Sequence, residues 1–556
     1  MAEKPRSAPL MVALGILASR LSGLIRETVA SRLLGNSAAA DAFSVAMRIP
    51  NLLQNLLGEG VLSASFVPVY SFMLNNVERT TTGEKEEEAN RVAGAVAALL
   101  MTVASVGVLL IVTFTRPAIA LLAPGLGEQR FELAVSLTRI TAVGVGFAVV
   151  SAWCLGVLNS HRHFFVSYVS PVVWNTVQIG ALVAAWILAF DLDDIARALA
   201  WGATVGSLTQ VLFQLPIIMC ITKGIKLNWG RGLQAVRDVI KRFMPTVLGR
   251  GVVQLTSYID LMLASLLAAG ALAALARAQI LYTLPISLFA LSIAAAELPE
   301  MSRQAKNLTA IAKRAQVGAR KVTFLMLYTA ATYIAIGDLL VNLLFEGGLF
   351  SAADTKMLWF TIAVYGIALP ATGINRILQN TCYALGNTSG PAWIATIRVT
   401  VAAIIGALLM FPLDRVVIND NGALQNIAEA LQLSWALPDT VREIDDVVRL
   451  GIVGLAAGSA VAAWVEAGLL VRLLNRKLEK IQIGKILLTP IGAAVAACVS
   501  AIFIKLLTKT WPVLLSTPLA LGVSVCIYTL TAHLSGVEES RLILNPVKAP
   551  FKDKHN

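Results

Sequence analysis

Long apolar segments recur from one end of the chain to the other, and they limit the possible folds more than any other feature. A window of about 19 residues finds fourteen of them in the sequence. Lipid offers the backbone no hydrogen-bond partners, so each segment must cross it as a helix. The sequence therefore predicts an all-α polytopic membrane protein with about fourteen transmembrane helices. Their predicted centres are Gly23, Leu56, Met101, Val145, Ile179, Ser207, Ser257, Phe289, Tyr328, Ile367, Ile404, Gly458, Val495 and Leu521.

The loops between these segments alternate in charge. Basic side chains crowd the loops at 223–242, 303–321 and 472–485, whereas the loop at 413–446 is rich in aspartate and glutamate. Because cytoplasmic loops carry an excess of lysine and arginine, the basic loops are predicted in the cytoplasm. An even number of helices places both termini there as well. This topology accounts for most of the net charge of +12, so no nucleic-acid partner is expected.

Two pairs of stretches repeat at an offset of six predicted helices. Residues 50–68 resemble 284–299, since each is rich in small residues and bracketed by prolines, and residues 158–171 resemble 383–391. Parallel repeats are typical of transporters, with the substrate path between the two halves. The predicted domains are a six-helix lobe at 1–222, a second at 223–480 with an acidic external insertion near 413–446, and two extra helices with a cytoplasmic tail at 481–556.

The acidic insertion has two interpretations. It is either an external element that binds a partner or a disordered spacer, and the second is favoured.

Charged residues inside the apolar segments are the candidate functional residues. An arginine near the middle of a bilayer about 30 Å thick normally faces a wet cavity or a counter-charge. Arginines outnumber carboxylates in these segments, which favours a cavity that receives an anion, and the planar guanidinium fork suits phosphate. The predicted substrate-binding residues are Arg20, Arg26, Arg48, Asn51 and Arg250, and the predicted counter-ion or gating residues are Glu27, Asp41, Glu59 and Asp260.

The geometry of the first helix adds a condition. On a regular helix Arg26 is rotated from Arg20 by about 120°. Both side chains reach one cavity only if the helix bends or unwinds, and Ser22-Gly23 is the expected place. Arg32, Arg277 and Arg398 lie nearer predicted helix ends and are expected to reach the membrane interface.

The acidic candidates have open alternatives. Asp41, next to an external loop, is either a counter-ion or a solvated or helix-capping residue. Asp260 is either a cation or proton site or the partner of Arg250 through a neighbouring helix.

The sequence does not predict an enzyme. It shows no nucleophile–base pair, no phosphate-binding glycine loop and no cluster of metal ligands, and the five cysteines fall in apolar stretches without ligand spacing. No cofactor and no metal are expected, so the candidate function is transport.

Several N-terminal motifs together resemble one known family. The stretches Ser19–Glu27, Asp41–Phe43, Ile49–Leu53, Gly58–Gly60 and Ala64–Pro68 are similar to the signature of the MurJ (MviN) family of bacterial lipid II flippases. The resemblance implies the fold of the multidrug/oligosaccharidyl-lipid/polysaccharide (MOP) exporters, with two lobes enclosing a cationic cavity, a lipid-facing groove on the last two helices, and alternating access in the bacterial inner membrane.

The resemblance also implies roles for individual residues. By position, Arg20 and Arg26 match the family's first-helix arginines, Glu27 an acidic position and Asp41 its loop aspartate. The implied ligand is lipid II, the lipid-linked peptidoglycan precursor, with its pyrophosphate held by the cationic cavity.

Two positions depart from the family pattern. Gln54-Asn55 and Ile280 stand where family members commonly carry arginine. Arg250, Arg277 or Arg376 are candidates to replace the charge. The departures keep other functions open: a flippase for another polyprenyl-linked saccharide, a cation-coupled exporter of the same fold, or a non-transporting scaffold for cell-wall synthesis proteins. The expected partners are lipid II or a related polyprenyl-pyrophosphate saccharide, and membrane lipids.

Overall fold

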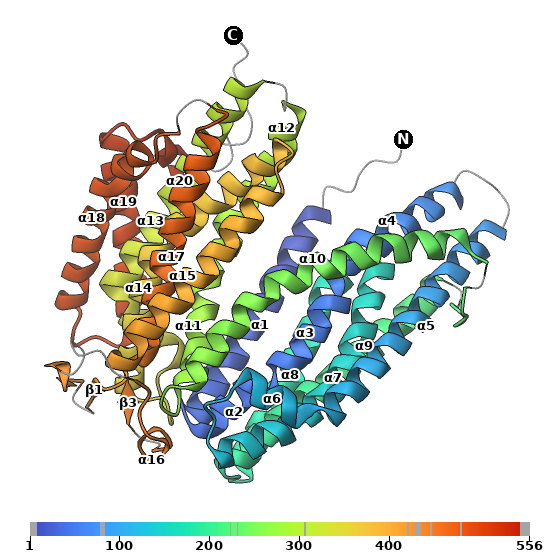
Figure 1. Ribbon diagram of the computed structural model, residues 1–556, viewed down its shortest axis with the longest axis horizontal. Coiled ribbons are helices and arrows are strands. Elements are labelled where there is room, and N and C mark those ends of the chain that lie inside the picture. Colours follow the sequence, from blue (N-terminus) through green and yellow to red (C-terminus); the bar gives the residue numbers. More distant parts are fainter. Residues whose placement is uncertain are drawn as a thin grey trace. The chain divides into compact units, whose positions relative to one another are not determined.

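The structure of the protein is a computed structural model, in which helices dominate (Figure 1). It describes residues 8–77, 84–222, 224–230, 232–304, 307–419, 422–428, 435–444, 447–478 and 481–544. Within these ranges, the side chains of residues 8–13, 75–77, 84–86 and 248–257 are not described.

Contacts divide the chain into two compact units. The first is Met1–Leu272 with Gly348–Phe350, and the second is Ala273–Gly347 with Ser351–Asn556. The lobe boundaries expected near residues 222 and 480 come from the internal repeat and stay a prediction.

The first unit is built around one long central helix, α7 (Glu128–Ser160), which contacts seven other helices of the unit. Its core gathers apolar side chains that include Phe66, Tyr70 and Trp153. The other helices are α1 (Ala8–Leu34), α2 (Ala38–Ala46), α3 (Arg48–Leu57), α4 (Glu59–Val77), α5 (Glu84–Thr113), α6 (Thr115–Leu122), α8 (Phe164–Ile187), α9 (Leu192–Ile221) and α10 (Gln234–Ser265).

The second unit packs its helices around α14 (Ala352–Ala384), which contacts α13 and α17. Its helices are α11 (Ala271–Pro285), the π-helix η1 (Ile286–Ala290), α12 (Leu291–Arg303), α13 (Leu308–Phe345), α15 (Ser389–Leu413), α16 (Asp439–Arg442), α17 (Gly451–Leu474), α18 (Ile483–Leu507), α19 (Val513–Leu534), the 3-10 helix η3 (Glu538–Ser540) and α20 (Arg541–Leu544).

The helices confirm the predicted class of fold. Among the described residues, twelve segments are long and apolar enough to cross a membrane. The two remaining predicted positions are occupied by α1, with 27 residues, and α10, with 32. At about 1.5 Å per residue, each exceeds a hydrocarbon core about 30 Å thick. The protein is an all-α polytopic membrane protein, and all fourteen predicted centres lie in helices.

The two proline-bracketed stretches are both interrupted helices. Residues 38–74 form α2, α3 and α4, with breaks at Met47 and Gly58. Residues 271–303 form α11 and α12, joined by the π-helix η1 directly after Pro285. Interrupted segments at corresponding positions of two repeats mark substrate sites in transporters.

The second repeated pair shares a helix end. Behind α7, the amide of His163 donates to the carbonyl of Leu158 over 2.9 Å, and behind α14 the amide of Asn387 donates to that of Cys382 over 2.9 Å. The preceding residue is left-handed in both, with φ of 65° at Arg162 and 73° at Gly386. This is the Schellman end of a helix. The same geometry follows α8 and α19, where Ala189 and Gly536 are left-handed, so the repeat stays a prediction from the sequence.

The acidic insertion is folded where the structure describes it. Strand β1 (Val417–Ile418) pairs antiparallel with β2 (Leu424–Gln425) and with β3 (Val448–Arg449). The Lys356 ammonium on α14 donates to the carbonyl of Gly422 over 3.1 Å. A disordered spacer therefore does not describe these residues, while 420–421, 429–434 and 445–446 lie outside the described part.

Candidate functional site

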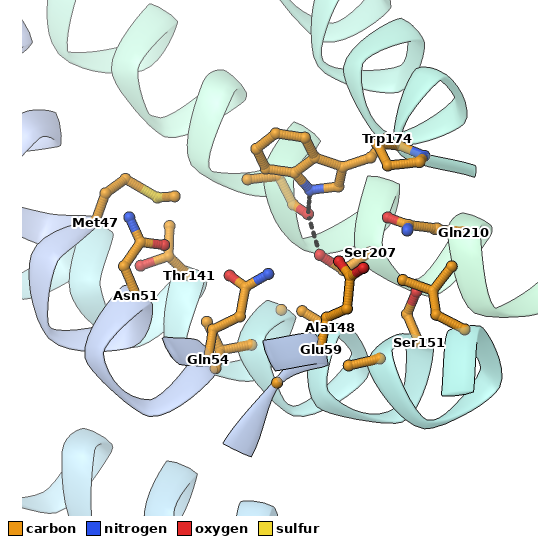
Figure 2. Close-up of a pocket in the computed structure, with 17 residues that line it drawn as sticks. Met47, Asn51, Gln54, Glu59, Thr141, Ala148, Ser151, Trp174, Ser207 and Gln210 are labelled. Carbon is orange, nitrogen blue, oxygen red and sulfur yellow. Dashed lines mark hydrogen bonds between the residues drawn. The ribbon is translucent and has the colours of Figure 1, made fainter. Parts of the chain in front are cut away.

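The two breaks in the second segment line one cavity of the first unit. Met47 and Gly58 border a space of about 260 Å³ whose other walls come from α3, α7, α8 and α9 (Figure 2). Gly58 is extended, with φ of −86° and ψ of −162°, and a Cβ there would overlap the carbonyl oxygen of Gln54. Non-helical backbone at membrane depth is tolerated where it is buried or lines a cavity. This cavity is the candidate substrate site.

The lining of this cavity, called here the polar cavity, combines apolar side chains with amides, hydroxyls and one carboxylate. Figure 2 shows Gln54 and Glu59 between Asn51 on one side and Gln210 on the other. Among the described residues, the amides of Asn51, Gln54 and Gln210 have no protein hydrogen-bond partner, and no arginine or lysine lines the space. The hydroxyls are already used, since Ser207 donates to the carbonyl of Ala203 over 3.0 Å. The free amides suit the hydroxyl and amide groups of a polar ligand.

Arg26 does not line this cavity but contacts Trp174, which does. Its guanidinium carbon is 5.0 Å from the centroid of the Trp174 ring, which lines the cavity, and the Trp174 indole donates to the carbonyl of Ala203 over 3.0 Å. The carboxylate of Glu27 is 3.5 Å from Arg26 Nη2. The Trp174 ring and the Glu27 carboxylate therefore fix the position of the Arg26 guanidinium. The guanidinium still has N–H groups that can donate hydrogen bonds to a ligand.

Arg20 lies apart from the cavity. Its side chain is exposed, and no described residue forms an ion pair or hydrogen bond with it. The helix α1 does not unwind at Ser22-Gly23, because it is helical through both residues. The alternative of a bend there stays a prediction. Asn175 of α8 instead donates to the Ser22 hydroxyl over 2.9 Å and holds this turn in place. The cavity therefore does not bring Arg20 and Arg26 together.

Asp41 is the counter-ion of an arginine that the sequence analysis missed. Arg130 Nη1 is 3.1 Å from Asp41 Oδ2, and the amide of Gly270 donates to the same oxygen over 2.8 Å. The side chains are 2% and 0% exposed. The capping alternative is wrong, since Ser37 caps α2. The sequence analysis did not count Arg130 among the charged residues inside the apolar segments, because it follows the polar stretch before α7. Its position in the first turn of that helix is the feature that could have identified it.

Arg48 and Asp260 are neighbours within the first unit. Arg48 begins α3 directly after the break at Met47, and its carbonyl accepts from the Tyr258 hydroxyl over 3.4 Å. Asp260 of α10 interacts electrostatically with the Arg48 guanidinium. The side chain of Arg250 lies outside the described residues, so its pairing with Asp260 stays untested.

The second unit contains a buried carboxylate that the sequence analysis also missed. Glu466 of α17 is 1% exposed and accepts from Arg398 Nη1, Asn375 Nδ2 and Gln379 Nε2, each over 2.8 Å. Arg398 therefore bonds to a buried partner, and the expectation that it reaches the interface is wrong. Buried charges persist when they are paired and fully hydrogen-bonded. The network ties α14, α15 and α17 together.

The other candidate replacements for the missing family arginines also lie in the second unit. Arg277 is buried at 3% exposure, so it does not reach the interface as expected, while Arg376 is exposed.

Solved structures show the class of protein that this fold defines. The fold is similar to that of a "Lipid II flippase MurJ, inward closed conformation", with a TM-score of 0.68 and 20% identity over 96% of this chain and 100% of that one. It is also similar to an inward-facing multidrug resistance MATE family transporter of the MOP superfamily, with a TM-score of 0.58 and 15% identity over 84% of this chain and 99% of that one. The fold is that of these membrane transporters.

Sequence comparison shows the family. The family model described as Lipid II flippase MurJ matches residues 30–442. The Lipid II flippase MurJ of Burkholderia cenocepacia is 32% identical over 387 residues, covering 68% of this chain and 73% of that protein. A probable lipid II flippase MurJ of Rhizobium tropici is 29% identical over 401 residues, covering 71% and 74%. The chain belongs to the MurJ lipid II flippase family, whose members are multi-pass transporters and not enzymes, and the resemblance seen in the sequence is confirmed.

Proposed function

We propose that the protein translocates lipid II across the cytoplasmic membrane by alternating access. The observation that carries this proposal is the family match over residues 30–442, which contains every residue that lines the polar cavity. That cavity lies at the breaks of a discontinuous helix, where transporters of this architecture bind their substrates.

In this proposal, the polar cavity and the neighbouring cations bind different parts of the substrate. The amides of Asn51, Gln54 and Gln210 bind the hydroxyl and amide groups of the headgroup. Arg26, held on Trp174, binds the pyrophosphate. Arg20, Arg48 and Arg250 are further pyrophosphate ligands in this proposal, with Glu27, Asp41, Glu59 and Asp260 as counter-ions or gating residues. Arg20 and Arg26 precede the matched range, so their role is supported by their place on α1.

The substrate tail and the topology complete the proposal. Helices α18 and α19 expose large apolar side chains, such as Leu488, Phe503 and Leu514, along which the polyprenyl tail remains in lipid. Both termini lie in the cytoplasm, as the basic loops predict. Cell-wall synthesis proteins are proposed as further partners.

A flippase for another polyprenyl-linked saccharide is the second candidate. Gln54 lies in the cavity at a position where the family pattern has arginine. Loss of a cation there weakens the argument for one particular headgroup while leaving the fold and the tail-binding surface unchanged.

Complementation tests the proposal. The chain is expressed in a bacterium depleted of its own lipid II flippase, and wild type is expected to restore growth. Arg26→Ala is expected to lower lipid II translocation about tenfold or more, since a hydrogen bond to a charged group contributes about 1.5–3 kcal/mol. The matched control is Arg197→Ala, whose exposed side chain pairs with Asp194 on the surface of α9.

Purified protein in lipid vesicles separates the alternatives. Translocation of lipid II supports the proposal, translocation of a different polyprenyl-linked saccharide supports the second candidate, and a protein that moves neither is a scaffold. The proposed substrate is wrong if wild type fails to complement and does not translocate lipid II in vesicles. The proposed pyrophosphate ligands are wrong if Arg20→Ala and Arg26→Ala both translocate lipid II as wild type does.

A further inference from the structure

The first unit holds a second cavity with the opposite chemistry. A groove of about 800 Å³ runs between α5, α7 and α9 and shares no lining residue with the polar cavity. Helix α7 separates the two, with Thr141 and Ser151 on the polar side and Phe147 and Val150 on the groove side. The volume is in the range of small-molecule sites, about 300–1,000 Å³. The groove is therefore a candidate binding site in its own right.

The walls of the groove suit a hydrocarbon chain. They are formed by aliphatic and aromatic side chains, and Trp153 directs its indole N–H away to the carbonyl of Ala93 over 3.1 Å. Along α5 the lining extends from Ala97 to Val112, about 22 Å at 1.5 Å per residue. Gly146 leaves space along this path. Even an added Cβ there would be only in ordinary van der Waals contact with Val108, at 3.5 Å.

Two basic side chains lie near one end of the groove, where Glu87 and Glu88 of α5 are exposed as well. The segment 224–230 crosses the start of α5, and two of its residues, Ile225 and Leu227, line the groove. Lys226 stands exposed between them, and Arg91 of α5 is exposed nearby. The contact is specific, because the Asn228 amide donates to the carbonyl of Arg91 over 2.8 Å.

The same end carries apolar side chains that suit a membrane interface. Leu227 and Trp229 are each 61% exposed. Tryptophan is enriched where lipid headgroups meet the hydrocarbon core. The groove thus opens at headgroup level, beside two cations.

We propose that this groove binds one acyl chain of an anionic phospholipid, with its headgroup phosphate at Lys226 and Arg91. The two basic side chains favour an anionic headgroup. The groove, about 22 Å along α5, is longer than one leaflet of a hydrocarbon core about 30 Å thick, so it has room for one chain. A polyprenyl chain is far longer and would leave most of its length outside. The bound lipid fills the space between α5, α7 and α9 and braces their packing. This site is independent of the substrate that the protein moves.

Photolabelling of the full chain tests the site. The probe is phosphatidylglycerol with a diazirine on its acyl chain, in phosphatidylcholine nanodiscs, and labelled residues are identified by mass spectrometry. Label is expected on the groove residues of α5, α7 and α9. Gly146→Leu is expected to reduce it about tenfold, which corresponds to about 1.4 kcal/mol or roughly two displaced methylene groups. The matched control is Gly180→Leu, where an added Cβ meets open space and the residue does not line the groove.

Charge reversal tests the mouth. With Lys226→Glu and Arg91→Glu, unlabelled phosphatidylglycerol is expected to lose its advantage over phosphatidylcholine as a competitor, by about fivefold for each charge. Lys241→Glu, an equal change on α10, is expected to keep it. Circular dichroism confirms that each variant is folded.

Three outcomes overturn the proposal: label spread evenly over exposed apolar side chains, equal competition by both phospholipids in the wild type, or stronger groove labelling by a photoreactive polyprenyl phosphate. The third outcome assigns the groove to the substrate tail.

Discussion

At the scale of single residues, Asp41 joins three segments of the first unit. It accepts from Arg130 of α7 and from the amide of Gly270, while it belongs to α2 itself. Gly270 has a φ of 88°, and a Cβ there would overlap the carbonyl oxygen of Asn36, so glycine is required at this contact. The carboxylate is buried, and its hydrogen bonds replace the water that it lost on folding.

Breaking this pair is expected to destabilise the protein strongly. Asp41→Ala should lower the free energy of unfolding by about 3–5 kcal/mol, because it leaves the Arg130 charge buried and without its carboxylate partner. Replacing both, with Arg130→Met, should recover part of the loss. Thermal unfolding in detergent measures each variant.

The matched control is the exposed pair of Arg116 and Glu132, with 58% and 48% exposed side chains 2.6 Å apart. Glu132→Ala should cost at most about 1 kcal/mol. Equal losses from Asp41→Ala and Glu132→Ala would contradict the assignment of Asp41 to a buried pair.

At the scale of helices, the break at Gly58 shapes the polar cavity. It ends α3 and lets α4 begin at Glu59, so Gln54 and Glu59 from two different helices face the same space. In an uninterrupted helix, Gln54 and Glu59 would share one helix axis, and the break that lets both side chains face the cavity would be lost. The site therefore depends on a local departure from helical geometry.

Gly58→Ala is expected to abolish complementation while the protein is still made and inserted. The added Cβ overlaps the carbonyl oxygen of Gln54, so α3 or α4 must shift at a cost of about 1–3 kcal/mol. Growth of the depleted strain and the amount of membrane-inserted protein are measured together. Gly180→Ala, where the new Cβ meets open space, serves as the control. Normal growth with Gly58→Ala would show that the break is not needed for transport.

At the scale of the whole molecule, the loops define a topology. The folded part of the acidic insertion exposes Trp435, whereas Ser302 is exposed beside the basic loop after α12. Because the positive-inside rule places basic loops in the cytoplasm, these two positions are predicted on opposite sides of the membrane.

Single cysteines test this topology. In a chain whose five native cysteines are replaced, Trp435→Cys should react with a membrane-impermeant maleimide on intact spheroplasts. Ser302→Cys should react only after the membrane is opened. The reverse pattern would invert the topology and place both termini outside.

Much of the fold can be predicted from the sequence, because each transmembrane helix corresponds to one contiguous run of apolar residues. The fourteen helix positions, the all-α membrane class and the family follow from local patterns. The interrupted segments were also visible, as glycines and prolines that bracket small residues. Two of the candidate site residues, Asn51 and Glu59, line the cavity, and Arg26 contacts Trp174 of its lining, while their roles stay predictions.

The tertiary structure alone decided which charges meet, because the partners come from distant parts of the chain. Asp41 and Arg130 are 89 residues apart, and Asn375 and Glu466 are 91 apart. Helical periodicity orients a side chain on its own helix but does not say which helix it faces. For the same reason the uninterrupted α1, the cation-free lining of the cavity and the apolar groove on the other side of α7 became visible only in three dimensions.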